Sequence, residues 1–183
     1  MKQETLQLTG GNSNGDRREL DFYPTPKDVT VALMDFLNLD PCVVWECAAG
    51  NGAMSNVIKS YGHNVIETDI ATGHDFLALT DIKADAIITN PPFNLSHLFI
   101  EKAVREAGVV CMLLKTQYWH ASKRYDLFNK HIPAYVLPLT WRPDFLEHER
   151  KPGDKKGAPT MEVAWTVWKR GSTTTEYKLL KRP

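Results

Sequence analysis

The chain has 183 residues, of which 43% are apolar and 24% are charged, so one folded domain is expected and a disordered or low-complexity chain is excluded. No apolar run approaches the roughly 18 residues of a membrane-spanning helix, and the N-terminal part lacks the apolar core of a signal peptide. Three cysteines form no disulfide framework, and neither they nor the histidines have metal-ligand spacing. We therefore expect a cytoplasmic protein without a metal site or a membrane partner.

Positive and negative charges balance at 22 each, but they are unevenly distributed along the chain. Residues 1–150 contain 14 basic and 19 acidic residues, whereas residues 151–183 contain 8 basic and 3 acidic ones. A positive field that attracts a polyanion would therefore lie in the last fifth of the chain. A solvated lysine-rich tail explains the same charges without any partner.

Residues 1–21 are polar and rich in glycine and asparagine, which predicts a flexible N-terminal arm before a single domain at residues 22–183. A helix is predicted next. Thr25 can cap it, Pro26 suits its first position, and apolar residues follow at helical spacing as far as Leu37. The other candidate elements are strands at residues 42–47, 64–69, 85–89, 109–114, 134–139 and 161–168, and helices between Gly52 and Gly62 and from Ser96, as the cap, to Gly108.

Strands that alternate with helices in one domain indicate an α/β fold, with a mostly parallel sheet and helices on both faces. No helical pattern separates the last two strand candidates, so we expect them to form an antiparallel pair. Sheets of this kind bind ligands at the carboxyl ends of their strands. Three loops of unusual composition lie at that predicted edge, at residues 46–52, 69–76 and 90–93.

The first of these loops has the pattern Glu46-x-Ala48-x-Gly50-x-Gly52 between a strand and a helix. Glycines let the backbone turn tightly and come close to a ligand. Ser55 replaces the third glycine of the dinucleotide fingerprint, and the Lys-Ser/Thr pair of a phosphate-binding loop is absent. The loop therefore favours a nucleotide cofactor without a pyrophosphate over NAD or ATP, with an ordinary strand-to-helix turn as the alternative.

Asp69 stands at the end of the second strand candidate, where an acid can accept hydrogen bonds from both hydroxyls of a ribose. In the loop that follows, Asp75 can accept a hydrogen bond from an adenine amino group while Phe76 packs on the ring. The competing interpretation is that Asp69 caps a turn and that Phe76 belongs to the core.

Asn90-Pro91-Pro92-Phe93 directly follows a buried strand and is the most specific motif in the chain. A planar exocyclic amine is a poor nucleophile because its lone pair is delocalised into the ring. The side-chain oxygen of Asn90 and a rigid proline carbonyl can each accept one amino hydrogen, which pulls the nitrogen towards tetrahedral geometry. The prolines hold these acceptors in place, and Phe93 offers a face to a flipped-out base.

These motifs resemble those of class I S-adenosylmethionine-dependent methyltransferases that act on amino groups. Residues 46–52 resemble motif I, Asp69 resembles the ribose-binding acid, residues 75–76 resemble motif III, and residues 90–93 match the catalytic (N/D/S)PP(Y/F/W) motif. Residues 22–26 resemble motif X of DNA adenine methyltransferases, and the order X, I, IV is the gamma-type arrangement. The small size is similar to that of phage- and prophage-encoded DNA adenine methyltransferases.

The resemblance implies the Rossmann-like fold of class I methyltransferases, with an antiparallel C-terminal strand, and S-adenosylmethionine as the cofactor. It implies transfer of a methyl group to the N6 amine of adenine in double-stranded DNA, by direct attack, in the cytoplasm of a bacterial host cell. The implied catalytic residues are Asn90, Pro91, Pro92 and Phe93, and the implied cofactor contacts are Tyr23, Pro24, Thr25, Glu46, Ala48, Gly50, Asp69, Asp75 and Phe76.

Contacts with DNA are expected from two places. Trp141 or Phe145, near the expected motif VIII, would help to hold the flipped base, and core packing is the alternative for both. A basic loop at residues 146–160 would bind phosphates, which carries no sequence information directly. No segment is long enough for a separate recognition domain, so three outcomes stay open: no sequence preference, a very short site, or a homodimer that completes the DNA surface. The basic side chains of the loop are Arg150, Lys151, Lys155 and Lys156.

Other functions also fit the motifs. Ribosomal RNA guanine and protein glutamine methyltransferases use similar ones, and methylation of the exocyclic amine of cytosine is chemically feasible. A methyltransferase fold without activity could serve as a nucleic-acid-binding or partner subunit, although an intact motif at residues 90–93 argues against that role. Methylation of a cytosine ring carbon is disfavoured, because no cysteine follows a proline in the expected loop.

Overall fold

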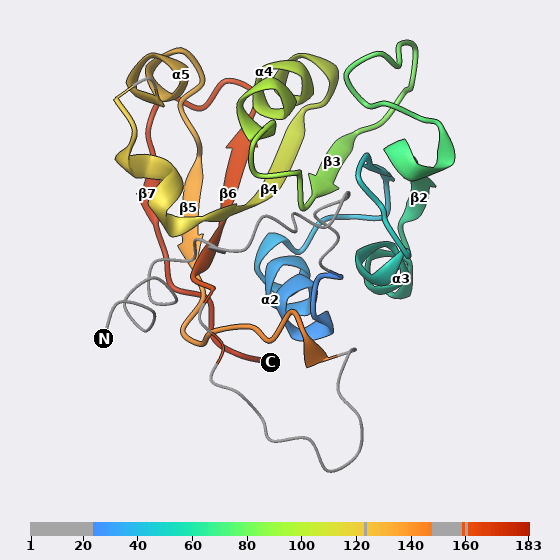
Figure 1. The fold of residues 1–183 in the computed structure, drawn as a ribbon, viewed down its shortest axis with the longest axis horizontal. Coiled ribbons are helices and arrows are strands. Elements are labelled where there is room, and N and C mark those ends of the chain that lie inside the picture. The colour runs from blue at the N-terminus through green and yellow to red at the C-terminus, as the bar shows by residue number, and fades with distance from the viewer. Residues whose placement is uncertain (1–23, 123, 148–158, 160) are drawn as a thin grey trace, which may run out of the picture.

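Strands and helices alternate along the chain, as the sequence predicts (Figure 1). The computed structural model describes residues 24–122, 124–147, 159 and 161–183. The predicted arm at residues 1–21 lies outside the described residues. The strands are β1 (Val43–Glu46), β2 (Asn64–Glu67), β3 (Ala86–Thr89), β4 (Val109–Lys115), β5 (Tyr135–Pro138), β6 (Val163–Lys169) and β7 (Glu176–Tyr177). The helices are α2 (Lys27–Leu37), α3 (Ala53–Ser60), α4 (Ser96–Glu106) and α5 (Arg124–Lys130), with short 3-10 helices η1 (Ile70–Thr72) and η2 (Thr116–His120).

The strands form one sheet in the order β2-β1-β3-β4-β6-β5-β7. β2, β1, β3 and β4 pair in parallel, and β6 lies antiparallel between β4 and β5. The predicted α/β fold with a mostly parallel sheet is confirmed, and so is the antiparallel pairing of the last two predicted strands. The two-residue strand β7, parallel to β5 at the sheet edge, is not among the predicted elements.

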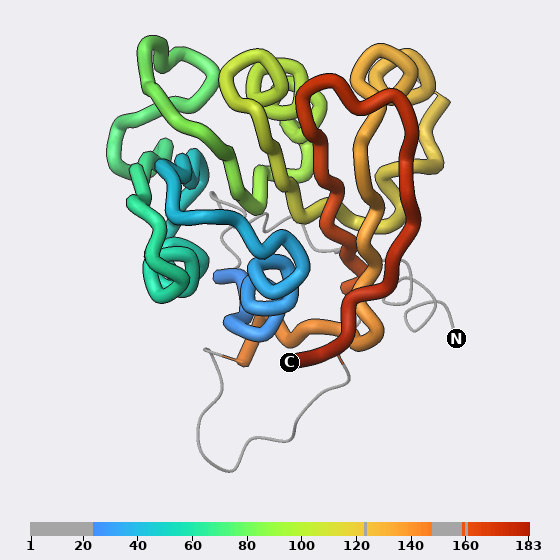
Figure 2. The backbone as a smooth tube through the Cα atoms, turned by 180° about the vertical axis from the view of Figure 1, so that it is seen from behind, coloured from blue at the N-terminus to red at the C-terminus, as the bar shows by residue number. Residues whose placement is uncertain are grey.

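Helices cover both faces of the sheet because alternate residues of each strand point to opposite sides. Val44 of β1 belongs to a buried cluster with residues of α2 and α3, while its neighbour Trp45 belongs to a second cluster with residues of α4 and α5. Figures 1 and 2 show these two helix layers on opposite sides of the sheet. In β6 six successive residues are buried, as expected for a strand with helices on both of its faces.

Two hydroxyl groups that the sequence suggests as helix caps have other partners. α2 begins one residue later than predicted, because Pro26 has an extended ψ of 142°, and no side chain caps the helix. Thr25, whose place before a proline disfavours helical geometry, accepts a hydrogen bond from Asn90 Nδ2 instead. Ser96 is the first residue of α4 rather than its cap, and its hydroxyl donates to two carbonyls of the preceding loop. Both hydroxyls thus contact the loop that follows β3.

The segment between β4 and β5 has no predicted element, yet it forms η2 and α5. α5 has seven residues, of which Leu127 is the fully buried one, so it lacks the repeated apolar positions that identify a helix in a sequence. Aromatic contacts attach the segment to the sheet instead. The ring of Phe128 lies between those of Trp119 and Trp168, with centroid distances of 4.0 and 6.4 Å.

Trp165 joins β6 to α2, since its side chain is fully buried and its indole Nε1 donates to the carbonyl of Val29 at 3.0 Å. We expect Trp165→Ala to lower the free energy of unfolding by about 3–5 kcal/mol, because it leaves a large cavity between the strand and the helix. Urea unfolding followed by circular dichroism measures this loss, with Tyr177→Ala at an exposed position as the control. An unchanged unfolding midpoint in Trp165→Ala would contradict this packing role.

Candidate active site

The strand order reverses beside β1, because the chain leaves β1 for β2 on one side and later enters β3 on the other. In open parallel sheets such a reversal leaves a crevice outside the carboxyl ends of the strands. A cavity of about 360 Å³ lies at this point. Its walls are Pro24, Thr25, Glu46, Ala48, Ala49, Gly50, Asn51, Ala53, Met54, Asp69, Ile70, Ala71, Asn90, Pro91, Pro92 and Phe93. All four predicted catalytic residues therefore share a cavity with six of the nine predicted cofactor contacts.

The turn after β1 depends on two glycines with left-handed backbone angles, Gly50 at φ 53° and Gly52 at φ 76°. Other residues avoid these angles because their Cβ clashes with the backbone. The carboxylate of Asp69, after β2, accepts hydrogen bonds from the backbone N–H groups of Gly50 and Ala71, both at 2.8 Å. Asp69 thus holds the loops after β1 and β2 together, and it caps η1, as the alternative interpretation of this residue expects.

Glu46 is a buried acid at the end of β1, and only 2% of its surface is exposed. Its carboxyl group accepts a hydrogen bond from the hydroxyl of Ser55, the residue that replaces the third glycine. Burial raises the pKa of Glu46 to about 8, the Ser55 bond opposes this rise, and the nearby carboxylates of Glu67 and Asp69 add to it. Glu46 is therefore mostly protonated at neutral pH and can donate a hydrogen bond as well as accept one.

The amide of Asn90 has one partner and one free end. Its Nδ2 donates to the hydroxyl of Thr25 at 3.2 Å, so the Oδ1 end faces away from this contact. Oδ1 is buried, and no donor among the described residues reaches it. A buried acceptor without a donor costs about 1–3 kcal/mol, which the N–H group of a ligand would recover.

Phe93 is half-buried at the cavity, with the ammonium group of Lys115 4.3 Å from the centre of its ring. Lys115 ends β4 and forms no ion pair with any residue that the structure describes. A cation over the ring favours one orientation of that ring. Lys115 is not among the residues predicted from the sequence, because nothing in the pattern indicates that residue 115 meets residue 93.

Two predicted adenine contacts do not line the cavity. Phe76 is 2% exposed and packs between Trp45 and Phe99, at centroid distances of 5.0 and 4.7 Å. The structure therefore places Phe76 in the core, as the alternative interpretation expects, because its position facing α4 buries the ring. Asp75 is exposed, and one of its oxygens accepts a hydrogen bond from the backbone N–H of Leu77.

The cavity also contains residues that the sequence analysis did not select. Ile70 directly follows Asp69 and is 61% exposed, so an apolar surface lies next to the acid. Its position directly after the second predicted strand could have indicated a place at the ligand site. An isoleucine at a strand end, however, more often indicates a place in the core. The other unselected wall residues are Ala49, Asn51, Ala53, Met54 and Ala71.

The residues predicted to contact DNA are either in the core or outside the described ranges. Phe145 is 4% exposed and belongs to the cluster that contains α2, and the half-buried Trp141 packs against the same cluster. Neither lines the cavity, because the loop after β5 folds back against α2. The predicted phosphate contacts Arg150, Lys151, Lys155 and Lys156, and the predicted cofactor contact Tyr23, lie outside the described residues.

Within the described ranges, no helix has the length and apolar character needed to cross a membrane. No group of three or more His, Cys, Asp or Glu side chains in the same ranges is placed to hold a metal ion.

Solved structures with the same architecture include methyltransferases. The type IIG restriction endonuclease BpuSI matches with a TM-score of 0.65 at 13% identity, over 97% of this chain and 28% of that one. A candidate RNA methyltransferase from Pyrococcus horikoshii matches with 0.62 at 16% identity, over 90% and 94%. The modification subunit of a candidate type I restriction enzyme from Vibrio vulnificus matches with 0.60 at 12% identity, over 98% and 51%. Neither a family sequence profile nor a curated protein sequence matches the chain. The fold is therefore the Rossmann-like fold of class I S-adenosylmethionine-dependent methyltransferases.

Glu46 should make the stability of the protein depend on pH. An acid whose pKa is raised by folding stabilises the fold fully below its usual pKa near 4.5, and this contribution is lost as the pH rises to about 8. We therefore expect the melting temperature to fall across this range, and Glu46→Gln to remove most of the fall. Thermal unfolding at both ends of the range measures it, with Glu101→Gln at a more exposed carboxylate as the control. A slope that persists in Glu46→Gln would contradict this assignment.

Proposed function

We propose that the protein transfers the methyl group of S-adenosylmethionine to the exocyclic N6 amine of adenine in DNA. The observation that carries this proposal is the side-chain oxygen of Asn90, which is buried and has no hydrogen-bond donor among the described residues. It belongs to the wall of a cavity that also contains the glycine turn and Asp69. An exocyclic amine supplies the N–H group that this oxygen lacks.

The residues of the cavity fit this cofactor. Each carboxylate oxygen of Asp69 accepts one backbone hydrogen bond and keeps capacity for a ribose hydroxyl. The apolar side chain of Ile70 offers a surface to the adenine ring. Glu46 and the hydroxyl of Thr25 would contact the methionine part, and Gly50 lets the backbone approach it closely.

Bound S-adenosylmethionine supplies a methyl group on a positively charged sulfur. Asn90 Oδ1 and the carbonyl of Pro91 accept the two amino hydrogens of the target base, so the lone pair of the nitrogen turns out of the ring plane. With the cofactor bound, this pair would be free to take the methyl group from the sulfur, S-adenosylhomocysteine would leave, and the surplus proton of the amine would pass to water. Phe93 packs on the base, and the two prolines keep both acceptors in place with little entropy left to lose.

DNA is the substrate that the residues favour, and RNA is the second candidate. Residues 22–26 resemble a motif of DNA adenine methyltransferases, and the structural neighbours include a restriction endonuclease and a modification subunit. The neighbour from Pyrococcus horikoshii, 94% of which this chain covers, is named as a candidate RNA methyltransferase. We expect little sequence preference or a short site, since phosphate contacts from the basic loop at residues 146–160 would carry no sequence information directly. A phage-encoded enzyme in a bacterial cytoplasm is the setting that the resemblance implies.

Incubation with unmodified DNA and isotopically labelled S-adenosylmethionine, digestion to nucleosides and mass spectrometry test base, atom and cofactor together. We expect the label in N6-methyladenine. Label in RNA alone would move the function to RNA. Cofactor binding without transfer to any nucleic acid would overturn the proposal and leave a binding or partner subunit.

Asn90→Ala removes the acceptor that orients the amine, so we expect the rate of methyl transfer to fall about 100-fold or more. The dissociation constant of S-adenosylhomocysteine, measured by calorimetry, should change little. Asn94→Ala, at an exposed position in the same loop, is the matched control. Loss of cofactor binding in Asn90→Ala would count against the role given to this side chain.

Thr25→Val keeps the shape of the side chain but removes the hydroxyl that holds the Asn90 amide. We expect the turnover at saturating cofactor to fall about 3- to 10-fold, the effect of one hydrogen bond, and Thr25→Ser to restore it. Steady-state kinetics with both variants measure the change. A loss confined to the KM for the cofactor would show that Thr25 serves binding alone.

A further inference from the structure

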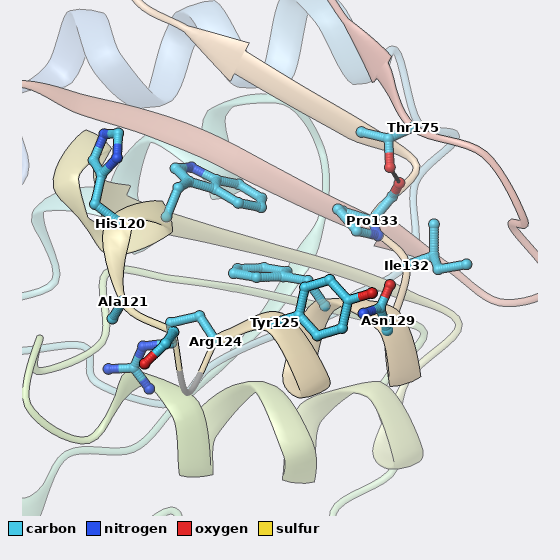
Figure 3. A pocket seen from close by; sticks show the side chains of 11 residues that line it. His120, Ala121, Arg124, Tyr125, Asn129, Ile132, Pro133 and Thr175 are labelled. Atoms are coloured by element: carbon cyan, nitrogen blue, oxygen red, sulfur yellow. Dashed lines mark hydrogen bonds between the residues drawn. The ribbon is translucent and has the colours of Figure 1, made fainter.

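A second cavity, of about 600 Å³, lies beside α5 and shares no wall residue with the proposed active site. Figure 3 shows its walls, with His120 from η2, Arg124 and Tyr125 from α5, and Pro133 and Thr175 from the loops before β5 and β7. The hydroxyl of Thr175 donates to the carbonyl of Pro133 at 2.7 Å, which ties the two loops together. The proposed catalytic chemistry makes no use of this cavity.

Trp119, Tyr125 and Phe128 line the cavity, and Phe128 and Trp119 continue a stack of rings that begins at Trp168 in the core. Trp168 is 4% exposed, and its Nε1 donates to the carbonyl of His131, so the innermost ring is fixed. Phe128 lies parallel to it within 3°, and Trp119 follows with its plane tilted by 23° and its centroid 4.0 Å from Phe128. Tyr125, at the mouth, is 73% exposed. The half-buried ring of Trp119 and the exposed ring of Tyr125, on the wall of one cavity, offer stacking surfaces to a planar ligand.

The segment that forms most of the cavity is rich in basic residues. Residues 115–133 contain four basic residues and one acidic residue, and one of the basic residues, Lys130, forms an ion pair with Glu101 of α4. The guanidinium group of Arg124 lies 4.0 Å from the ring centre of Tyr118, and Lys115 lies over Phe93 in a similar way. Neither cation forms an ion pair with a residue in the described part of the chain. Unpaired cations beside exposed aromatic rings complement a phosphodiester strand with unpaired bases.

The wall that η2 provides lies next to the catalytic loop, whereas Pro133 and Thr175 lie at the opposite edge of the sheet, before β5 and β7. Lys115 ends β4 and contacts Phe93, and η2 begins at the next residue. Trp119 is four residues beyond Lys115, which is about 8 Å in a 3-10 helix. A strand whose target base lies on Phe93 can therefore continue past Lys115 along η2 towards Trp119.

We propose that this cavity binds an unpaired nucleobase of the strand that carries the target adenine, with Trp119 and Tyr125 as its stacking surfaces. Lys115 and Arg124 bind the phosphates between the two bases. The inference rests on the proposed function, because it takes nucleic acid as the substrate. It narrows that substrate to a single-stranded nucleic acid, or to a duplex whose strands are separated next to the target adenine.

Fluorescence anisotropy with a short labelled single-stranded DNA, and with the matching duplex, tests this. We expect the wild type to prefer the single strand, and Trp119→Ala and Tyr125→Ala each to weaken its binding about tenfold. Tyr177→Ala, which removes a 67% exposed tyrosine on β7, is the matched control and should bind like the wild type. The affinity for S-adenosylhomocysteine should be the same in all four proteins.

The salt dependence of single-strand binding measures the phosphate contacts separately from base stacking. For Arg124→Gln we expect the slope of log Kd against log salt concentration to decrease by about 0.7, the value for one phosphate contact in a single strand. An unchanged slope would remove Arg124 from the phosphate contacts. If Trp119→Ala does not fold, Tyr125→Ala gives the same reading, because its ring is 73% exposed and its loss leaves the core intact.

Unchanged single-strand binding in Trp119→Ala and Tyr125→Ala, or an equal loss in Tyr177→Ala, would overturn the inference while methyl transfer by the wild type still supported the proposed function. Binding that depends on Trp119 without any methyl transfer would overturn the function and leave the cavity as a site that binds single-stranded DNA. A wild type that binds no oligonucleotide would overturn both. A dimer in sedimentation experiments that Trp119→Ala dissociates would instead assign the cavity to a second copy of the chain.

Discussion

The site depends on the parallel pairing of β1 with a strand on each side. Trp45 is aligned with Ile66 of β2 and with Ile87 of β3, so the three strands end at the same level. The loops that follow must then emerge side by side, although they are far apart in the chain. A register slip of one residue would turn the side chains of a strand to the opposite face of the sheet. Val44 and Trp45 would exchange their buried clusters, and the crevice would lose its walls.

The polar groups around the crevice differ in whether they have hydrogen-bond partners within the described part of the chain. Asp69 receives two backbone hydrogen bonds, and Glu46 receives the hydroxyl of Ser55. These groups hold the loops in a fixed shape. The Oδ1 atom of Asn90 is buried without a donor from the described residues, so folding has already removed its water. Acceptors that are oriented and desolvated before the ligand arrives need no reorganisation during the reaction.

The elements and motifs that follow from local patterns could be predicted from the sequence. Apolar runs indicated the strands, and the rule that ligands bind at strand ends grouped the three loops correctly. Contacts between distant segments could not be predicted, because no local pattern records them. Asn90 meets Thr25 across 65 positions in the chain. Phe76 is in a loop that the sequence places near the site, but its ring packs between Trp45 and Phe99 in the core.

The segment from Lys115 to Pro133 shows a second reason for missed features. Its helix is short and its contacts are aromatic, so neither periodicity nor a motif marks it. Trp141 and Phe145 show the reverse case, since both were considered for base binding by position relative to the motifs and both pack against the core. An aromatic residue near a motif is ambiguous until its neighbours in space are known.

The position of β6 has a consequence for how the protein is made. β6 lies in the interior of the sheet between β4 and β5, but it is nearly the last strand in the chain. Its Trp165 completes the core against Val29, 136 residues earlier. During synthesis, β4 and β5 therefore have no partner between them until residues 163–169 leave the ribosome. Contacts of such long range slow folding, so the nascent chain exposes two unpaired strand edges until β6 pairs with both.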